Sequence, residues 1–137
     1  MILIDTGPLV AVFDKKDKSH AICLEIVKNI KTPFITTMPV VTETFYLLRY
    51  SWHTQNKLWE TIEEGLLRIY SIDANMLRRC RELMNKYQDL PMDFADASLV
   101  AVADKENISK IFTLDHKDFK TYRTKSGKSF RLLPSIL

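Results

Sequence analysis

Three residue types that commonly build cofactor and metal sites are scarce in this chain. Its 137 residues include only 3 glycines, 2 cysteines and 3 histidines. So few glycines leave no GxGxxG dinucleotide loop, and Gly127-Lys128-Ser129 is not a phosphate-binding P-loop because Tyr122 stands where the first glycine is required. Cys23 and Cys80 have no CxxC spacing and no histidine partner, which excludes a thiolate zinc site and favours two small core residues.

Long apolar runs and a basic leader are also missing. No run approaches the ~20 apolar residues of a membrane span. Asp5 stands where a signal peptide would carry its basic region. We therefore expect a cytoplasmic protein with no membrane segment. The length predicts a single domain over residues 1–137, and 46% hydrophobic with 27% charged residues is typical of globular proteins.

The chain does contain short apolar runs that alternate with helical patterns. Runs at 2–4, 33–37, 70–72, 110–114 and 130–133 predict strands. Continuously apolar strands are buried on both faces, so the pattern predicts an α/β fold with a mainly parallel sheet and helices on both sides.

Helix boundaries are predicted from capping residues and apolar spacing. Asp73 is the expected cap of a helix over 74–87, and Asn107 the expected left-handed end of a helix that begins after Asp93. Residues 116–119 are expected to form a turn, and Thr54 is the expected cap of an amphipathic helix. That helix is expected to carry an apolar stripe of Trp59, Ile62, Leu66 and Ile69.

Aspartates end two of the predicted strands. Asp5 follows the first apolar run, and Asp115 follows the run at 110–114. The carboxyl ends of parallel strands meet at one edge of a sheet, which is where open α/β sheets bind ligands. A carboxylate in that position contributes no packing, which favours a functional role for both residues.

Further acids lie at or near the starts of predicted helices. Asp93 and Asp96 share one helical face and, considered alone, are explained as a cap and its partner. Glu43 is predicted on an inward-looking helical face, either at the core edge or in a cleft. Asp118 competes with Asp115 as a ligand, but it lies beyond the apolar run and is expected to face solvent.

Four or five carboxylates in one site repel one another unless cations intervene. Mg²⁺ or Mn²⁺ suits such a set because both prefer oxygen ligands, whereas the scarcity of histidine and cysteine argues against zinc and iron. Such a centre activates water for phosphodiester displacement. If the site takes Asp5, Glu43, Asp93, Asp96 and Asp115, 12 of the 17 acidic residues remain against 20 basic residues. This surplus of eight basic side chains suits a polyanion.

A basic segment near the carboxyl terminus has two interpretations. It is either a solvated loop or a nucleic-acid contact, with Phe119 and Tyr122 interleaved among the charges. Its basic residues are Lys117, Lys120, Arg123, Lys125, Lys128 and Arg131.

Four stretches together resemble the PIN domain nucleases, and within them the VapC-type ribonuclease toxins. They are ILIDTGPLVAVFD, VVTETFYLL, DFADASLVAVAD and IFTLDHKDF. The resemblance implies a three-layer α/β/α sandwich, frequent homodimers and an antitoxin whose tail occupies the active-site groove.

The resemblance also assigns site residues. It implies that the catalytic acids are Asp5, Glu43, Asp96 and Asp115, and that Mg²⁺ or Mn²⁺ is bound by Asp5, Asp93, Asp96 and Asp115. It implies that hydroxyls of Thr6 and Thr113 line the site. With Lys117 and Arg123 of the basic segment, they are the expected substrate-binding residues.

The leading hypothesis is a metal-dependent ribonuclease that acts as the toxin of a toxin–antitoxin pair. The alternative is a non-catalytic RNA- or partner-binding module on the same scaffold, with structural acids or a silent ion. A third hypothesis is a receiver-like signalling domain, since an aspartate at a strand end can accept a phosphoryl group. Asp115 stands where such a domain needs a late-strand lysine, which argues against this third hypothesis.

Overall fold

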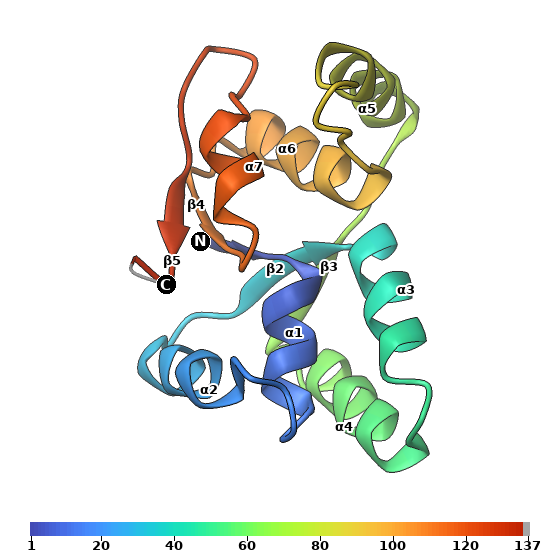
Figure 1. Cartoon of the computed structure of the whole chain (residues 1–137). Helices are drawn as coiled ribbons and strands as arrows, with labels where there is room; N and C mark the ends of the chain where they lie inside the picture. The colour runs from blue at the N-terminus through green and yellow to red at the C-terminus, as the bar shows by residue number, and fades with distance from the viewer. Residues whose placement is uncertain (136–137) are drawn as a thin grey trace.

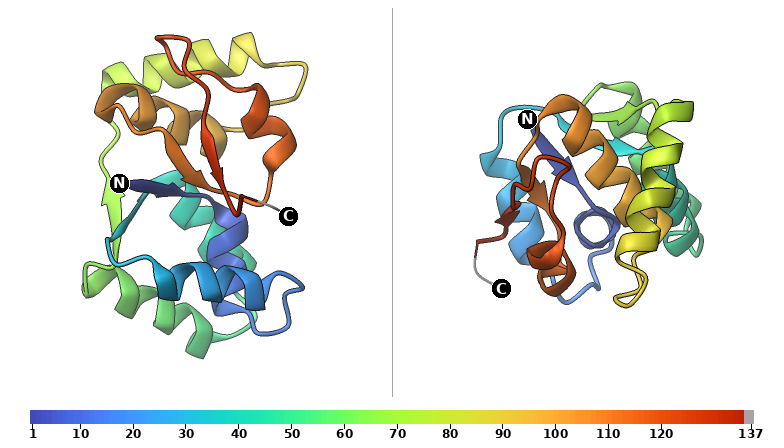
Figure 2. Two further views of the ribbon diagram at one scale, coloured as in Figure 1. Left: turned by 90° about the vertical axis from the view of Figure 1, so that its left-hand side faces the viewer. Right: turned by 90° about the horizontal axis from the view of Figure 1, so that it is seen from above.

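The computed structural model describes residues 1–135 and contains a five-stranded sheet between layers of helices (Figures 1 and 2). The strands, in chain order, are β1 Ile2–Ile4, β2 Phe34–Thr37, β3 Leu67–Tyr70, β4 Lys110–Phe112 and β5 Arg131–Leu133. The helices are α1 Thr6–Phe13, α2 His20–Asn29, α3 Met38–Leu47, α4 Trp52–Glu63, α5 Ala74–Lys86, α6 Phe94–Glu106 and α7 His116–Thr121.

All neighbouring strands are parallel, in the order β3-β2-β1-β4-β5. The central strands are apolar and covered on both faces: Leu3 and Ile111 have no exposed surface and Ile4 has 1%. This confirms the predicted parallel sheet, since helices on both faces are what such strands require.

The helices form two layers, which confirms the three-layer sandwich. α1, α2 and α4 cover one face of the sheet, and α5, α6 and α7 cover the other (Figures 1 and 2). α3 contacts both α1 and α6, which belong to different layers. The chain leaves β1 toward one layer and β4 toward the other, so the carboxyl ends of these adjacent strands form the topological switch point where α/β sheets bind ligands.

Helix α6 is the most deeply buried helix of the described structure. Every residue from Ala95 to Ala103 is buried. At the end of β2, the hydroxyl of Thr37 lies 2.6 Å from that of Ser98, which also donates to the carbonyl of Ala95 at 2.7 Å. These bonds fix the first turns of α6 at the carboxyl edge of the sheet. The helix ends at Asn107 with φ 55°, the predicted left-handed cap.

Two helix boundaries were predicted wrongly. The Oγ of Ser51 accepts from the backbone N–H of Thr54 at 3.2 Å, so Ser51 caps α4 and Thr54 lies inside the first turn. Residues 116–119, expected to be a turn, belong to the short helix α7. No helix within residues 1–135 is long and apolar enough to cross a bilayer.

The predicted helical stripe through Leu66 and Ile69 is also wrong. Gly65 adopts φ +78°, a left-handed conformation that ends the α4 segment and turns the chain. β3 then starts at Leu67, three residues before the predicted strand. Apolar spacing did not distinguish the last helical turn from the strand that follows it.

Candidate active site

Asp5 occupies the carboxyl end of β1 and is buried, with 8% of its surface exposed. One carboxylate oxygen accepts from the hydroxyl of Thr113 at 3.0 Å, and the other accepts from the N–H of Thr6 at 2.8 Å. Burial raises the pKa of Asp5 to about 6, and these two hydrogen bonds oppose part of the rise. The negative charges of Asp93 and Glu43 raise the pKa further.

The first turn of α6 supplies the next two acids. Asp93 caps the helix, because its Oδ1 accepts from the N–H of Asp96 at 2.8 Å. The carboxylate of Asp96 accepts a 2.9 Å hydrogen bond from the hydroxyl of Tyr122. Burial raises the pKa of Asp96 to about 8, and the charges of Asp5 and Asp93 add to the rise.

Helix α7 repeats the same arrangement with Asp115 and Asp118. Asp115 caps the helix by accepting from the N–H of Asp118 at 3.3 Å. One oxygen from each of Asp96, Asp115 and Asp118 lies within 4.8 Å of the others. Burial and then the hydrogen bond with Asp115 raise the pKa of Asp118.

The prediction that Asp118 faces solvent is therefore wrong, since it is half-buried and belongs to the acidic cluster. A signal for it was present in the sequence. The spacing from Asp115 to Asp118 equals the spacing from Asp93 to Asp96 at the start of α6. In both pairs the first acid caps the helix and the second projects from its first turn.

These acids line one cavity of about 700 Å³. Its seven carboxylate residues are Asp5, Asp17, Glu43, Asp93, Asp96, Asp115 and Asp118. Within residues 1–135, Lys18 is the one basic residue that lines this cavity. Asp17 and Lys18 come from the loop after α1 and were not predicted as site residues. The cavity is therefore strongly acidic and has little internal charge compensation.

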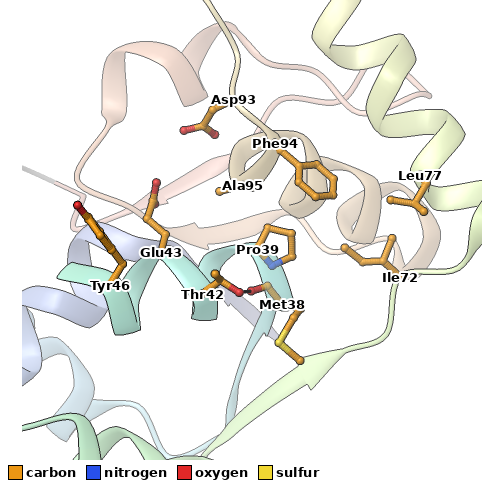
Figure 3. A pocket seen from close by; sticks show the side chains of 10 residues that line it. All are labelled: Met38, Pro39, Thr42, Glu43, Tyr46, Ile72, Leu77, Asp93, Phe94 and Ala95. Atoms are coloured by element: carbon orange, nitrogen blue, oxygen red, sulfur yellow. Dashed lines mark hydrogen bonds between the residues drawn. The ribbon is translucent and has the colours of Figure 1, made fainter. Parts of the chain in front are cut away.

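The side chain of Glu43 is exposed and lines a cleft, the second of its two predicted positions, and it is not buried at the core edge. It stands at the border between the acidic cavity and an adjoining groove of about 750 Å³, and Asp93 stands there with it. In Figure 3 the two carboxylates project on the same side of the groove. The rest of the groove lining is mainly apolar, including Met38, Ile72 and Phe94.

The donor set of the cavity fits a hard divalent cation. The ligand atoms that converge from α6 and α7 are all carboxylate oxygens, which Mg²⁺ and Mn²⁺ prefer over the nitrogen and sulfur ligands of zinc. The buried hydroxyl of Thr6 lies on the same cavity and has no hydrogen-bond partner within residues 1–135. It is free to bond a water molecule or a substrate oxygen.

The four predicted substrate-binding residues lie in different environments. Thr6 and Thr113 both contact Asp5. Lys117 is exposed on α7, next to Asp118. The guanidinium of Arg123 donates to backbone carbonyls of residues 120–122 at 2.6 to 3.2 Å, so it stabilises the end of α7.

The aromatic residues of the basic segment are not available to stack on bases, contrary to the sequence interpretation. Phe119 and Tyr122 have no exposed surface. Their rings pack edge to face on one another, and Phe130 and Tyr87 extend the contact. In this segment only the basic side chains, and not the aromatic rings, are therefore left to contact a nucleic acid.

The chain matches the family model described as PIN domain over residues 2–125. It is 27% identical over 135 residues to Ribonuclease VapC26 of Mycobacterium tuberculosis (strain ATCC 25618 / H37Rv). That match covers 97% of this chain and 100% of the relative.

Solved structures share the fold. Mycobacterium tuberculosis VapC20, described as a Sarcin-Ricin loop cleaving toxin, superposes with a TM-score of 0.74 at 18% identity, covering 81% of this chain and 87% of that one. VapBC2 from Rickettsia felis, bound to a DNA fragment from its promoter, gives 0.67 at 22% identity, covering 96% and 98%. With a family model that spans almost the whole sequence and a fold shared with these structures, this chain belongs to the PIN domain family.

Proposed function

We propose that this protein is a metal-dependent endoribonuclease and the toxin of a toxin–antitoxin pair. The observation that carries the proposal is the convergence of acids from β1, α6 and α7 on one cavity with a single lysine in its lining. The relative named Ribonuclease VapC26, which aligns over its full length, supports the same activity.

Asp96, Asp115 and Asp118 would hold the ion, with Asp5 beside them at the end of β1. A bound Mg²⁺ or Mn²⁺ would supply Lewis-acid activation of water and neutralise charge on the phosphate. Thr113 holds Asp5 in place through its hydroxyl. Because the acids repel one another without a cation, the cavity would bind a divalent ion in preference to an anionic substrate alone.

Four other residues would act on the substrate. Glu43 lies at the cavity border and is placed to orient the attacking water and accept its proton. Lys18 lines the cavity and Lys117 is exposed on α7, so both can pair with backbone phosphates. The unpartnered hydroxyl of Thr6 can donate to a phosphate oxygen.

Cleavage of RNA by the purified protein with Mn²⁺ tests this function. The wild-type protein should cleave, whereas Asp5→Asn should not, because the substitution removes a carboxylate from the cavity. The amide oxygen of the variant can still accept from the N–H of Thr6, and its amide N–H can donate to the hydroxyl of Thr113. RNA binding without turnover by the wild-type protein would instead support a non-catalytic module. Equal cleavage by the two proteins would reject the assignment.

We further infer an antitoxin partner, supported by a structural neighbour described as a toxin–antitoxin complex from Klebsiella pneumoniae. The groove of Figure 3 fits a segment that places apolar side chains against Met38, Ile72 and Phe94 and a basic side chain against Glu43 and Asp93. Co-expression with the product of any small reading frame next to its gene, followed by a cleavage assay, tests this partner: an antitoxin should abolish cleavage, and unchanged cleavage would reject that product as the partner.

A homodimer and a cytoplasmic location complete the proposal. Large apolar side chains are exposed on α3 and on the segment that leads into and forms α4, namely Tyr46, Leu47, Tyr50, Trp52 and Trp59. An exposed surface of this kind is typical of an interface. Light scattering on the purified protein measures the oligomeric state. The buried Cys23 and Cys80 are unpaired, which suits a reducing compartment.

A further inference from the structure

Tyr122 is the one buried hydroxyl donor to an acid of the α6–α7 cluster within the described residues. It follows α7 directly and has no exposed surface. Its ring packs edge to face on Tyr87 and Phe119, each at 5.0 Å between ring centroids. The position of the ring is thus fixed by the core, and its hydroxyl points toward the acidic cavity.

The hydroxyl of Tyr122 donates to Oδ2 of Asp96 at 2.9 Å. Asp96 forms no ion pair with a basic residue in residues 1–135, and its neighbours in the cluster are the acids Asp115 and Asp118. Without the hydroxyl, like-charge repulsion would favour rotation of the Asp96 carboxylate away from these acids. The hydrogen bond therefore opposes a movement that would open the cluster.

The backbone around Tyr122 is held on both sides. The N–H of Tyr122 donates to the carbonyl of Asp118 at 3.1 Å, and the guanidinium of Arg123 donates to the carbonyl of Tyr122 at 2.9 Å. Two residues later, the N–H of Lys125 donates to Asp104 at 2.6 Å. The donor thus sits on a rigid support, which is what a group that orients a ligand requires.

We propose that Tyr122 is a positioning residue whose hydroxyl holds Asp96 in the orientation that binds the divalent ion. The inference rests on the proposed function, since it takes the acidic cluster as the metal centre. Hydrogen bonds to metal-binding carboxylates fix their orientation, and losing such a partner typically weakens metal affinity 10- to 100-fold. Tyr122 acts on the ion only through Asp96.

The test compares Tyr122→Phe with Tyr87→Phe in Mn²⁺ binding, followed by electron paramagnetic resonance in the absence of RNA. Both substitutions delete one buried hydroxyl from the same aromatic layer, but only that of Tyr122 contacts an acid. We expect Tyr122→Phe to weaken Mn²⁺ binding about tenfold and Tyr87→Phe to leave it within about twofold of the wild-type value. Near-ultraviolet circular dichroism checks that each variant is folded.

Unchanged or tighter Mn²⁺ binding by Tyr122→Phe would overturn the proposal, as would equal weakening by both variants, which would indicate a loss of packing. A second readout needs no variant at Tyr122. Mg²⁺ added to the wild-type protein and to Tyr87→Phe should produce a tyrosine difference spectrum, and a flat spectrum at saturation would also overturn the proposal. A wild-type protein that binds Mn²⁺ but leaves RNA intact would reject the nuclease function alone, because the binding comparison does not use RNA.

Discussion

The two ends of helix α6 carry aspartates in opposite electrostatic environments. Near the carboxyl end, Asp104 accepts from Nε of Arg79 at 2.6 Å and from the N–H of Lys125 at 2.6 Å. In the first turn, Asp96 accepts from the hydroxyl of Tyr122 and faces other acids. Both residues are largely buried and contact the same segment, 122–125. The fold therefore neutralises one acid and leaves the other uncompensated, which is typical of a functional site.

The largest difference between the two ends should appear in catalysis. Asp96→Asn removes a proposed metal ligand. It should lower the rate of RNA cleavage with Mn²⁺ by more than about 100-fold, because the loss of a hydrogen-bond partner of a metal ligand already costs up to about 100-fold. Asp104→Asn is the matched control on the same helix and should cleave within about threefold of the wild-type rate once its folded fraction is confirmed. Similar losses of RNA cleavage in both variants would contradict a catalytic role for the first turn of α6.

Metal should stabilise the protein through the acidic end alone. Mn²⁺ at about 100 times its dissociation constant should raise the free energy of unfolding by about 2.7 kcal/mol, because the ion binds the folded chain. Thermal unfolding with and without Mn²⁺ measures this effect. Asp104→Asn should keep the increase and Asp96→Asn should lose most of it. An equal increase in the free energy of unfolding of both variants would indicate that Mn²⁺ binds outside the acidic cluster.

Without metal, the two substitutions should change stability in opposite directions. Asp104→Asn leaves Arg79 without its carboxylate and should cost about 2 kcal/mol, less than a fully buried pair because the side chains retain 19% and 11% exposure. Asp96 has a folded-state pKa of about 8, so it must bind a proton when the metal-free chain folds at pH 7. Asp96→Asn removes this cost and should gain on the order of 2 kcal/mol. Urea unfolding in EDTA measures both changes. Destabilisation by Asp96→Asn would contradict the electrostatic account.

The stability of the metal-free protein should depend on pH because of its buried acids. The folded-state pKa values of about 6 for Asp5 and about 8 for Asp96 exceed their ordinary value of 3.8. The folded chain therefore binds more protons than the unfolded chain, so stability falls as the pH rises through these values. Melting temperatures in EDTA between about pH 5 and pH 8 should decrease in the wild-type protein. Asp96→Asn should flatten the decrease. A melting temperature of the wild-type protein that rises with pH would contradict the raised pKa values.

The smallest expected effect concerns Asp93, which combines a capping role with a position on the cavity. Asp93→Asn keeps a good capping side chain, so the free energy of unfolding should change by less than about 0.5 kcal/mol. Its effect on Mn²⁺ affinity should be smaller than that of Asp96→Asn, because Asp93 lies outside the group of closest oxygens. Calorimetric titration separates the two roles, and equal losses of affinity would make Asp93 a full ligand.

The sequence was sufficient to predict the sheet and most of the acids that line the candidate site, because these depend on local patterns. Apolar runs that end in Asp5 and Asp115 mark β1 and β4, and adjacent parallel strands necessarily bring these ends together. Asp73 and Asn107 delimit helices by side-chain and backbone preferences that act within a few residues.

The features that were missed depend on contacts between distant segments. Nothing local distinguishes Tyr122 from an exposed aromatic in a basic loop, and its burial follows only from packing on Tyr87 and Phe119. Likewise, Asp17 and Lys18 reach the cavity only because the loop after α1 lies beside α3. The β3 boundary failed for a different reason, since an apolar period fits a helix and a strand until the left-handed Gly65 separates them.

The hydrogen bond between Asp5 and Thr113 joins residues 108 positions apart. Parallel pairing of β1 with β4 therefore cannot form until most of the chain has left the ribosome, and such distant contacts form late in folding. Any chain that stops before Thr113 lacks Asp115 and Asp118 as well as the partner of Asp5. A nascent or prematurely terminated product would thus have no complete acidic site, so the proposed active centre assembles only after synthesis is nearly finished.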